Sequence, residues 1–301
     1  MNDFRLKVFL SVARNLSFTK AARELFVSQP AVTKHVQELE TAYGMRLFER
    51  QGSRITLTEA GCLLQEHGER ILADYRRLEF EMNILRDRRA GELRLGASTT
   101  IAQYVLPSVL AGFIQRFPNV HLSLLNGNSQ EVEIALQEGR IDLGLVEGIH
   151  RSPGLKYTVF LQDELVAVVS TCSKLRMSDE ITPRDLTHLP LALREQGSGT
   201  LDVIGRALAG HGIKLSDLHV LMHLGSTESI KRFLEHADCM GIVSVRSIRR
   251  ELAEGRFRVV DVEGMPMHRD FCFVRLQGQD DGLAQTFESF ALRMEQEKRL
   301  I

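Results

Sequence analysis

Apolar residues recur every three or four positions in the first part of the chain, which is the spacing of one helix face. This pattern predicts helices over residues 4–15, 19–25 and 29–43. The third helix has a good start, because Ser28 can cap its free backbone amides and Pro30 fits its first turn. Two short helices joined by a three-residue turn indicate a helix-turn-helix, whose second helix enters the DNA major groove.

The polar face of the third helix is the part that would meet DNA. It carries Gln29, Thr33, Lys34 and Gln37. Gln can pair with adenine and Lys with guanine, and Thr offers a hydroxyl or a methyl group. The alternative is an ordinary helical hairpin with a solvated polar face. This stretch by itself leaves both interpretations open.

A short hairpin follows, with strands predicted at residues 47–48 and 55–57. It carries Arg46, Arg50 and Arg54. Arginines on such a wing can reach phosphates or an adjacent minor groove. A solvated hairpin is the alternative, but its position directly after a helix-turn-helix favours contact with DNA.

A long helix is predicted from residue 59 to about residue 89. Its apolar residues are spaced seven, four, three, four and three apart: Leu64, Ile71, Tyr75, Leu78, Met82 and Leu85. Such a heptad seam favours pairing with a second helix. We therefore interpret it as a dimerisation element, which would present two heads to a two-fold symmetric operator. The alternative is a helix that lies against its own body.

The rest of the chain alternates strand and helix patterns, which predicts a mostly parallel sheet with helices on both faces. Residues 156–170 are predicted to form two strands with a break near Gln162 and Asp163. Two sets of such units with two crossings predict two lobes with a cleft between them.

Composition adds bounds to this picture. The chain has 301 residues, 44% hydrophobic and 26% charged, as expected for a globular protein of about two domains. No apolar run approaches the roughly 20 residues of a membrane span, and the N-terminus lacks a signal segment. We therefore expect a cytoplasmic protein with no membrane partner. The net charge is −1, yet residues 1–60 hold nine Lys and Arg against six Asp and Glu, which fits DNA binding confined to that segment.

Motifs for metal binding and catalysis are missing from the sequence. Cys62, Cys172, Cys239 and Cys272 are far apart and form no CxxC pair. We interpret them as incidental thiols, and a redox-sensing pair stays open. No HExxH arrangement is present, and we predict no metal site. No GxSxG, GxGxxG or GKS/T motif stands in a suitable context, so we predict no catalytic residue and no cofactor.

The strongest resemblance lies in the segment that reads FLSVARNLSFTKAARELFVSQPAVTKHVQELETAYGMRLFERQGSRITLTEAG. It closely resembles the winged helix-turn-helix of LysR-type transcriptional regulators. The long helix and the remainder resemble the linker and effector-binding domain of the same family, so the resemblance covers essentially the whole chain. The implied fold class is α/β, with a winged head, a linker helix and a two-lobed body similar in architecture to periplasmic binding proteins.

The resemblance implies a regulator that binds double-stranded DNA, forms a homodimer and commonly a homotetramer, and meets RNA polymerase. It carries the DNA-facing role onto Gln29, Pro30, Thr33 and Lys34 of the third helix and onto Arg50 and Arg54 of the wing. Ser28 is better interpreted as the helix cap than as a base reader.

The expected domains follow from the same comparison. The winged head spans residues 1–58, the linker helix 59–90 and the effector-binding domain 91–301. Within that domain, lobe I comprises about 92–161 plus 268–301, and lobe II about 162–267.

A small-molecule effector, which we expect to be anionic, would bind between the lobes. Open α/β sheets bind ligands where strands end and helices begin, and the free amides of a helix start suit an anion. The candidate effector-binding residues lie in such loops: Ser98, Thr99, Thr100, Asn128, Glu147, Gln196, Ser198, Thr200 and Thr227. Simple helix capping is the alternative role for several of them, including Asn128 and Thr200.

A ligand that prefers one arrangement of the lobes would shift the population toward it. The linker helices would then change the spacing of the two heads. The alternative is the same DNA-binding head on a constitutive, ligand-free oligomerisation body.

Overall fold

The computed structural model describes residues 4–51, 54–85, 91–149, 151–175, 178–278 and 282–298. The chain forms two compact units, residues 1–91 with 281–283 and residues 92–280 with 284–301. Among the described helices, none has both the length and the apolar character that crossing a membrane requires.

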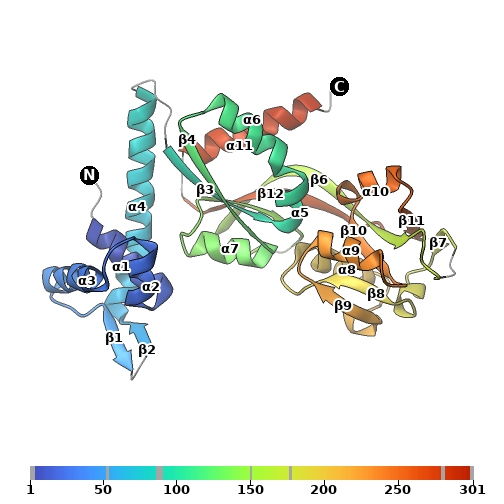
Figure 1. The fold of residues 1–301 in the computed structure, drawn as a ribbon, viewed down its shortest axis with the longest axis horizontal. Helices are drawn as coiled ribbons and strands as arrows, with labels where there is room; N and C mark the ends of the chain where they lie inside the picture. Colours follow the sequence, from blue (N-terminus) through green and yellow to red (C-terminus); the bar gives the residue numbers. More distant parts are fainter. Residues whose placement is uncertain are drawn as a thin grey trace. The chain divides into compact units, whose positions relative to one another are not determined.

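Three short helices build the head of the N-terminal unit (Figure 1): α1 (Phe4–Asn15), α2 (Phe18–Glu24) and α3 (Gln29–Tyr43). They confirm the three predicted helices to within a residue at each end. Their boundaries follow from capping, since the Ser17 and Ser28 hydroxyls accept backbone amides of α2 and α3. Gly44 ends α3 in the left-handed conformation that favours glycine. The apolar stripes meet in one core that includes Phe9, Val32 and Val36.

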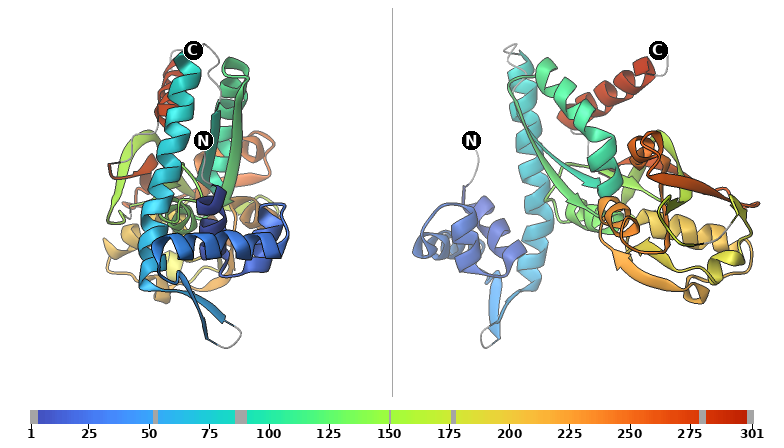
Figure 2. Two further views of the ribbon diagram at one scale, coloured as in Figure 1. Left: turned by 90° about the vertical axis from the view of Figure 1, so that its left-hand side faces the viewer. Right: turned by 45° about the vertical axis from the view of Figure 1, so that its right-hand side comes forward.

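A two-stranded ribbon follows the head, formed by β1 (Phe48–Gln51) and β2 (Arg54–Leu57) in antiparallel register. Figure 2 shows this ribbon projecting from the helices, as a wing does. The first strand begins one residue later than predicted, because Leu47 is buried in the head core. The side chains of Arg50 and Arg54 lie outside the part of the chain that the structure describes.

The long helix α4 runs from Glu59 to Leu85, and the rest of its predicted span lies outside the described residues. The Thr58 hydroxyl accepts the Gly61 amide at 3.0 Å and caps its start. Its first turns pack on the head, where an added Cβ at Gly68 would lie 2.9 Å from Leu6 Cδ1.

The seam residues of α4 therefore divide into two groups. Leu64 is partly buried against the head core. Further along the helix, Ile71, Leu78 and Met82 remain 44–53% exposed. The side chain of Leu85 lies outside the described residues. Within the N-terminal unit, the head core thus covers this apolar stripe mainly at the start of the helix.

The C-terminal unit is built on one 10-stranded sheet. Its strands are β3 (Gly91–Ser98), β4 (Val120–Gly127), β5 (Leu143–Glu147), β6 (Leu155–Ser170), β7 (Glu180–Ile181), β8 (Leu191–Arg194), β9 (Val220–Leu224), β10 (Met240–Ser244), β11 (Phe257–Val262) and β12 (His268–Leu276). The order along the main path is β4-β3-β5-β12-β6-β10-β8-β9. Strands β3 and β5 pair in parallel, as do β8 with β9 and β8 with β10.

The two central strands depart from the predicted parallel arrangement. Both β6 and β12 pair antiparallel with their neighbours. The predicted break near Gln162 and Asp163 is wrong, because β6 is one continuous strand of 16 residues. Its first part pairs with β12 and its last part with β10 and β11, so its backbone hydrogen bonds continue on new partners. This strand joins the first group of strands (β4, β3, β5) to the second group (β10, β8, β9).

Helices cover both faces of the sheet (Figure 1). They are α5 (Thr99–Tyr104), α6 (Leu106–Arg116), α7 (Ser129–Gln137), α8 (Gly199–Ala209), α9 (Thr227–Leu234), α10 (Arg249–Ala253) and α11 (Gly282–Lys298), with 3-10 turns η1 (Asp185–Thr187), η2 (Leu215–Asp217) and η3 (Val245–Ser247). The sequence pattern of residues 182–186 predicts a short helix, and the structure has the 3-10 turn η1 there instead. Strand β8 shows how both faces are filled, since Leu191 and Leu193 join one core and Ala192 the other. The division of this unit into two lobes, with the limits given above, stays a prediction.

Candidate DNA interface and ligand cavities

The start of α3 presents the predicted base-reading residues. Its inner face holds Val32 at 0% exposure, and its outer face holds Gln29, Pro30 and Lys34, all exposed. Thr33 is half-buried, and its hydroxyl donates to the Gln29 carbonyl at 3.1 Å. Three of the four predicted residues on α3 are thus free to meet a partner, and Thr33 offers its methyl group more readily than its proton.

Helix capping accounts for several of the predicted ligand-contacting residues. Asn128 forms a capping box on α7 with Glu131. Ser198 caps α8 by accepting the Thr200 amide at 3.2 Å. Ser226, which precedes the predicted Thr227, caps α9. Capping uses only part of each side chain, so it does not by itself remove these residues from a ligand site.

Ser98 behaves differently from these capping residues. It stands at the N-cap position of α5 without a side-chain capping bond. It is 1% exposed, and its hydroxyl has no hydrogen-bond partner. A buried polar group usually has a partner, so Ser98 marks a point where the protein leaves a polar group unsatisfied.

Glu147 is the centre of a buried polar network. The Thr100 and Thr200 hydroxyls both donate to its Oε1 atom at 3.2 Å. Arg269, at 0% side-chain exposure, approaches the same oxygen at 3.3 Å and Asp163 at 2.8 Å. The loop before α8 thus packs against the end of β5. Two of the predicted residues, Thr100 and Thr200, are both partners of the third, Glu147.

The fit between these segments is close at the backbone. A Cβ added to Gly199 would lie 2.0 Å from the Glu147 carbonyl oxygen. A Cβ at Gly148 would lie 2.8 Å from the Gly199 Cα. Only glycine allows the two segments to approach this closely.

Arg194 ties the two groups of strands together at a second point. Arg194 is the last residue of β8, and its side chain is almost fully buried. It donates to the Thr99 hydroxyl at 2.7 Å and to the Gly225 carbonyl at 3.3 Å. The Arg194 guanidinium also donates two hydrogen bonds to the Glu195 carboxylate, at 2.9 Å each. Its Nη1 atom is buried and has no partner.

Tyr104 on α5 makes a third connection, to Glu228 on α9. The tyrosine hydroxyl donates to the Glu228 carboxylate. Burial and this hydrogen bond raise the pKa of Tyr104 above its ordinary value. Burial alone would raise the pKa of Glu228, but hydrogen bonds from Lys231 and Tyr104 lower it instead. The buried Lys231 ammonium also pairs with Glu251 at 2.7 Å.

A cavity of about 420 Å³, the cleft cavity, lies beside Arg194. It is lined by Thr99, Gln103, Asn126, Gly127, Asn128, Glu131, Glu195, Gly225 and Ser226. The Oε1 atom of Gln103 is buried without a partner. Thr99 and Asn128 are the two predicted ligand-contacting residues that line it, whereas the exposed Gln196 does not.

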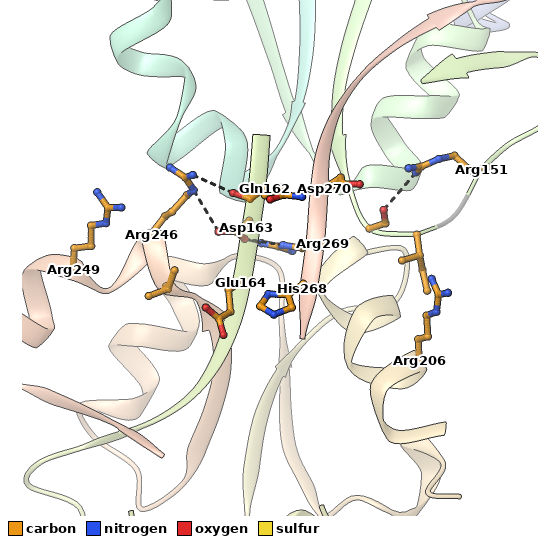
Figure 3. Close-up of a pocket in the computed structure, with 13 residues that line it drawn as sticks. Arg151, Gln162, Asp163, Glu164, Arg206, Arg246, Arg249, His268, Arg269 and Asp270 are labelled. Carbon is orange, nitrogen blue, oxygen red and sulfur yellow. Dashed lines mark hydrogen bonds and ion pairs between the residues drawn. The ribbon is translucent and has the colours of Figure 1, made fainter. Parts of the chain in front are cut away.

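A second cavity of about 730 Å³, the arginine cavity, lies over the central strands. It is lined by Gly148, Ile149, Arg151, Gln162, Asp163, Glu164, Arg206, Val245, Arg246, Arg249, His268, Arg269 and Asp270. Figure 3 shows Arg246 and Arg249 on one side of β6 and Arg206 on the far side of β12. Arg246 forms an ion pair with Asp163 at 3.5 Å and donates a hydrogen bond to the Gln162 carbonyl at 3.1 Å. The two cavities share no lining residue, and no described cluster of His, Cys, Asp and Glu could hold a metal ion.

Two family descriptions match the chain. "Bacterial regulatory helix-turn-helix protein, lysR family" covers residues 4–62. "LysR substrate binding domain" covers residues 86–295. The chain belongs to the LysR family. This LysR-family protein is therefore a transcriptional regulator with a DNA-binding head and an effector-binding domain, and not an enzyme.

Relatives resemble this chain in sequence, and solved structures resemble it in fold. The HTH-type transcriptional regulator CbbR of Rhodospirillum rubrum is 32% identical over 91% of this chain and 90% of its own. The regulatory domain of Synechocystis CcmR in complex with 2-PG is 26% identical, with a TM-score of 0.61 over 67% of this chain and 96% of that one. Full-length CbnR complexed with its target DNA is 22% identical, with a TM-score of 0.63 over 97% and 99% of the two chains, and shows the shared fold.

Several residues of this LysR-family protein's network were not among the predicted ones. Arg269 and Asp163 lie at buried positions of their strands, and the residues two positions away, on the same face of each strand, are apolar. A charge at an inward strand position needs a buried partner, and that signal was present in the sequence. Arg194, the charged and buried last residue of the otherwise apolar strand β8, gave the same signal. Gln103 gave none, because a glutamine on a helix carries no pattern of its own.

Proposed function

We propose that this protein is a sequence-specific regulator whose α3 residues read a two-fold symmetric operator. The observation that carries this proposal is the outer face of α3, where Gln29, Pro30 and Lys34 are exposed above a fully buried stripe. Helix-turn-helix proteins place these first residues of the second helix on base edges. The wing residues Arg50 and Arg54 are proposed as phosphate or minor-groove contacts on sequence alone.

Lys34→Ala is expected to weaken binding by about 1–3 kcal/mol if Lys34 reads a base. Lys34→Ala should lose affinity, relative to the wild-type protein, for operators that keep the base pair read by Lys34. For operators in which that pair is changed, the two proteins should bind equally. Binding of single-base-pair operator variants, measured in solution, checks this. Lys7→Ala on α1 serves as the control. A uniform loss across all variants would make Lys34 a phosphate contact instead.

We propose that the exposed part of the α4 seam pairs with the same helix of a second chain. Ile71, Leu78 and Met82 form a stripe that their own unit leaves uncovered, and a heptad stripe is covered best by another helix. A tetramer, a contact with RNA polymerase and a cytoplasmic location remain further proposals from the family.

The effector is proposed to bind in the cleft cavity. Thr99 and Asn128 line it, and the unpartnered Gln103 oxygen and Arg194 Nη1 are unsatisfied groups in and beside it. Unpaired buried polar groups are costly unless a ligand or water satisfies them. Arg194 supports an anionic ligand, although Glu195 offsets its charge. We therefore propose a small hydroxylated acid, with its acidic group toward Arg194.

The arginine cavity is the second candidate site, favoured by its five arginines against three carboxylates. Two matched variants separate the candidates. Gln103→Leu changes only the cleft cavity and Arg249→Gln only the arginine cavity, and neither removes an interaction between described residues.

Thermal unfolding of the full-length protein, with a panel of hydroxylated carboxylates and phosphates, is the test. Ligand at 100 times its dissociation constant stabilises by about 2.7 kcal/mol. We expect the stabilisation by an active compound to be lost in Gln103→Leu and kept in Arg249→Gln. The reverse result moves the site to the arginine cavity. Stabilisation by no compound would favour the ligand-free oligomerisation body.

A further inference from the structure

Phe26, in the turn between α2 and α3, is the most exposed large apolar residue of the described chain. Its side chain is 95% exposed. Its backbone has φ +54°, in the left-handed region. Phenylalanine gains nothing for the fold from such exposure, since the hydrophobic effect rewards only buried area.

The turn itself explains the backbone but not the side chain. The Val27 amide donates to the Ala22 carbonyl at 3.0 Å, and the Phe26 amide donates to the Arg23 carbonyl at 3.3 Å. These are the two bonds of a helix end in which the residue after the cap is left-handed. Glycine is the usual residue there, because a Cβ strains this conformation. The turn would therefore form more readily with glycine at position 26.

Backbone strain that does not stabilise the fold is a reason to look for a function. Phe26 stands three residues before Gln29, so their Cα atoms are at most about 11 Å apart. The α3 start enters the DNA groove in this class of head. Phe26 thus precedes this end of α3 closely with an exposed ring, and aromatic side chains can pack on the methyl group of thymine.

We propose that Phe26 is a DNA-contacting residue, whose ring makes an apolar contact with a thymine methyl group or a deoxyribose at the edge of the groove. The inference rests on the proposed placement of α3 in the groove. It adds a contact that capping, charge and hydrogen-bonding patterns do not reveal.

The experiment compares Phe26→Gly with Leu16→Gly in the full-length protein. Leu16 is the other described non-glycine residue with positive φ, at +44°, and lies between α1 and α2 with 47% exposure. Both variants relieve backbone strain, so we expect both to raise the unfolding midpoint by about 2–4 °C. Only Phe26→Gly should weaken binding, by about 5- to 30-fold, to a duplex selected by the wild-type protein from random-sequence DNA. Phe26→Tyr should bind as the wild type does.

Two further arms sharpen the result. Replacing thymine by uracil in the duplex removes the methyl group. If uracil weakens binding of the wild-type protein but not of Phe26→Gly, the methyl group is the contact. If uracil leaves the affinity of the wild-type protein unchanged, the sugar is the contact. Unchanged affinity in Phe26→Gly, or an equal loss in Leu16→Gly, would overturn the proposal. If Lys34→Ala also leaves binding unchanged, the placement of α3 fails; if Lys34→Ala weakens binding while Phe26→Gly does not, only the role of Phe26 fails.

Discussion

Arg269→Leu is expected to destabilise the C-terminal unit by about 3–5 kcal/mol, because it leaves the buried Glu147 carboxylate without its cation and the buried Asp163 with only the longer ion pair to Arg246, at 3.5 Å. Arg269 pairs with Asp163 at 2.8 Å and with Glu147 at 3.3 Å. All three side chains are at most 1% exposed. Water cannot replace the lost guanidinium at such a site, so the Glu147 carboxylate carries an uncompensated desolvation cost.

Chemical unfolding of the full-length variant, followed by circular dichroism, measures this loss. Arg232→Leu is the matched control, since its pair with Glu235 has the arginine 72% exposed and should contribute at most about 1 kcal/mol. Adding Glu147→Gln and Asp163→Asn to Arg269→Leu should recover part of the stability, because the buried charges are then gone. Equal losses in Arg269→Leu and Arg232→Leu would show that the network does not stabilise the unit.

Gly199→Ala has the second largest expected effect, a loss of about 1–3 kcal/mol through overpacking. The new Cβ would lie 2.0 Å from the Glu147 carbonyl oxygen and 2.5 Å from its carbon. These are backbone atoms, so a rotamer change cannot relieve the clash. The end of β5 and the start of α8 must move apart, which also disturbs the hydroxyls of Thr100 and Thr200 around Glu147.

Gly205→Ala in the same helix is the control for Gly199→Ala. Its Cβ would meet only the Leu215 side chain, at 3.1 Å, and alanine favours a helix interior over glycine. We expect its unfolding midpoint to stay near the wild-type value or rise. Unfolding curves of the two variants compare the effects directly, and a harmless Gly199→Ala would mean that the two segments do not hold each other as closely as described.

The head shows how far local patterns reach. The buried stripe of Val32, Val36 and Leu39, the Ser28 cap and the Gly44 stop fix α3 within the chain segment itself. Each depends on neighbours no more than four residues away, which is why the helices of the head could be predicted closely. The wing strand at Leu47 was placed a residue early, because its burial depends on the core around it.

The body shows where such patterns end. The charged Asp163 was interpreted as a break in a strand, but its charge is neutralised by Arg269, 106 residues further along. Thr100, Glu147 and Thr200 were predicted as ligand contacts by their places at strand and helix ends. The structure brings them together and makes them partners of one another, while Thr99 and Asn128 line a cavity.

The sequence by itself determined the order of the helices and strands, their caps and the family of this regulator, because these depend on local spacing and on a segment-long motif. The tertiary structure alone decided that β6 is unbroken, that Arg269 and Arg194 hold the domain together, and that two cavities with different linings exist. The physical reason is that a buried charge is stable only beside a partner, and the chain brings that partner from a distant segment only when it folds.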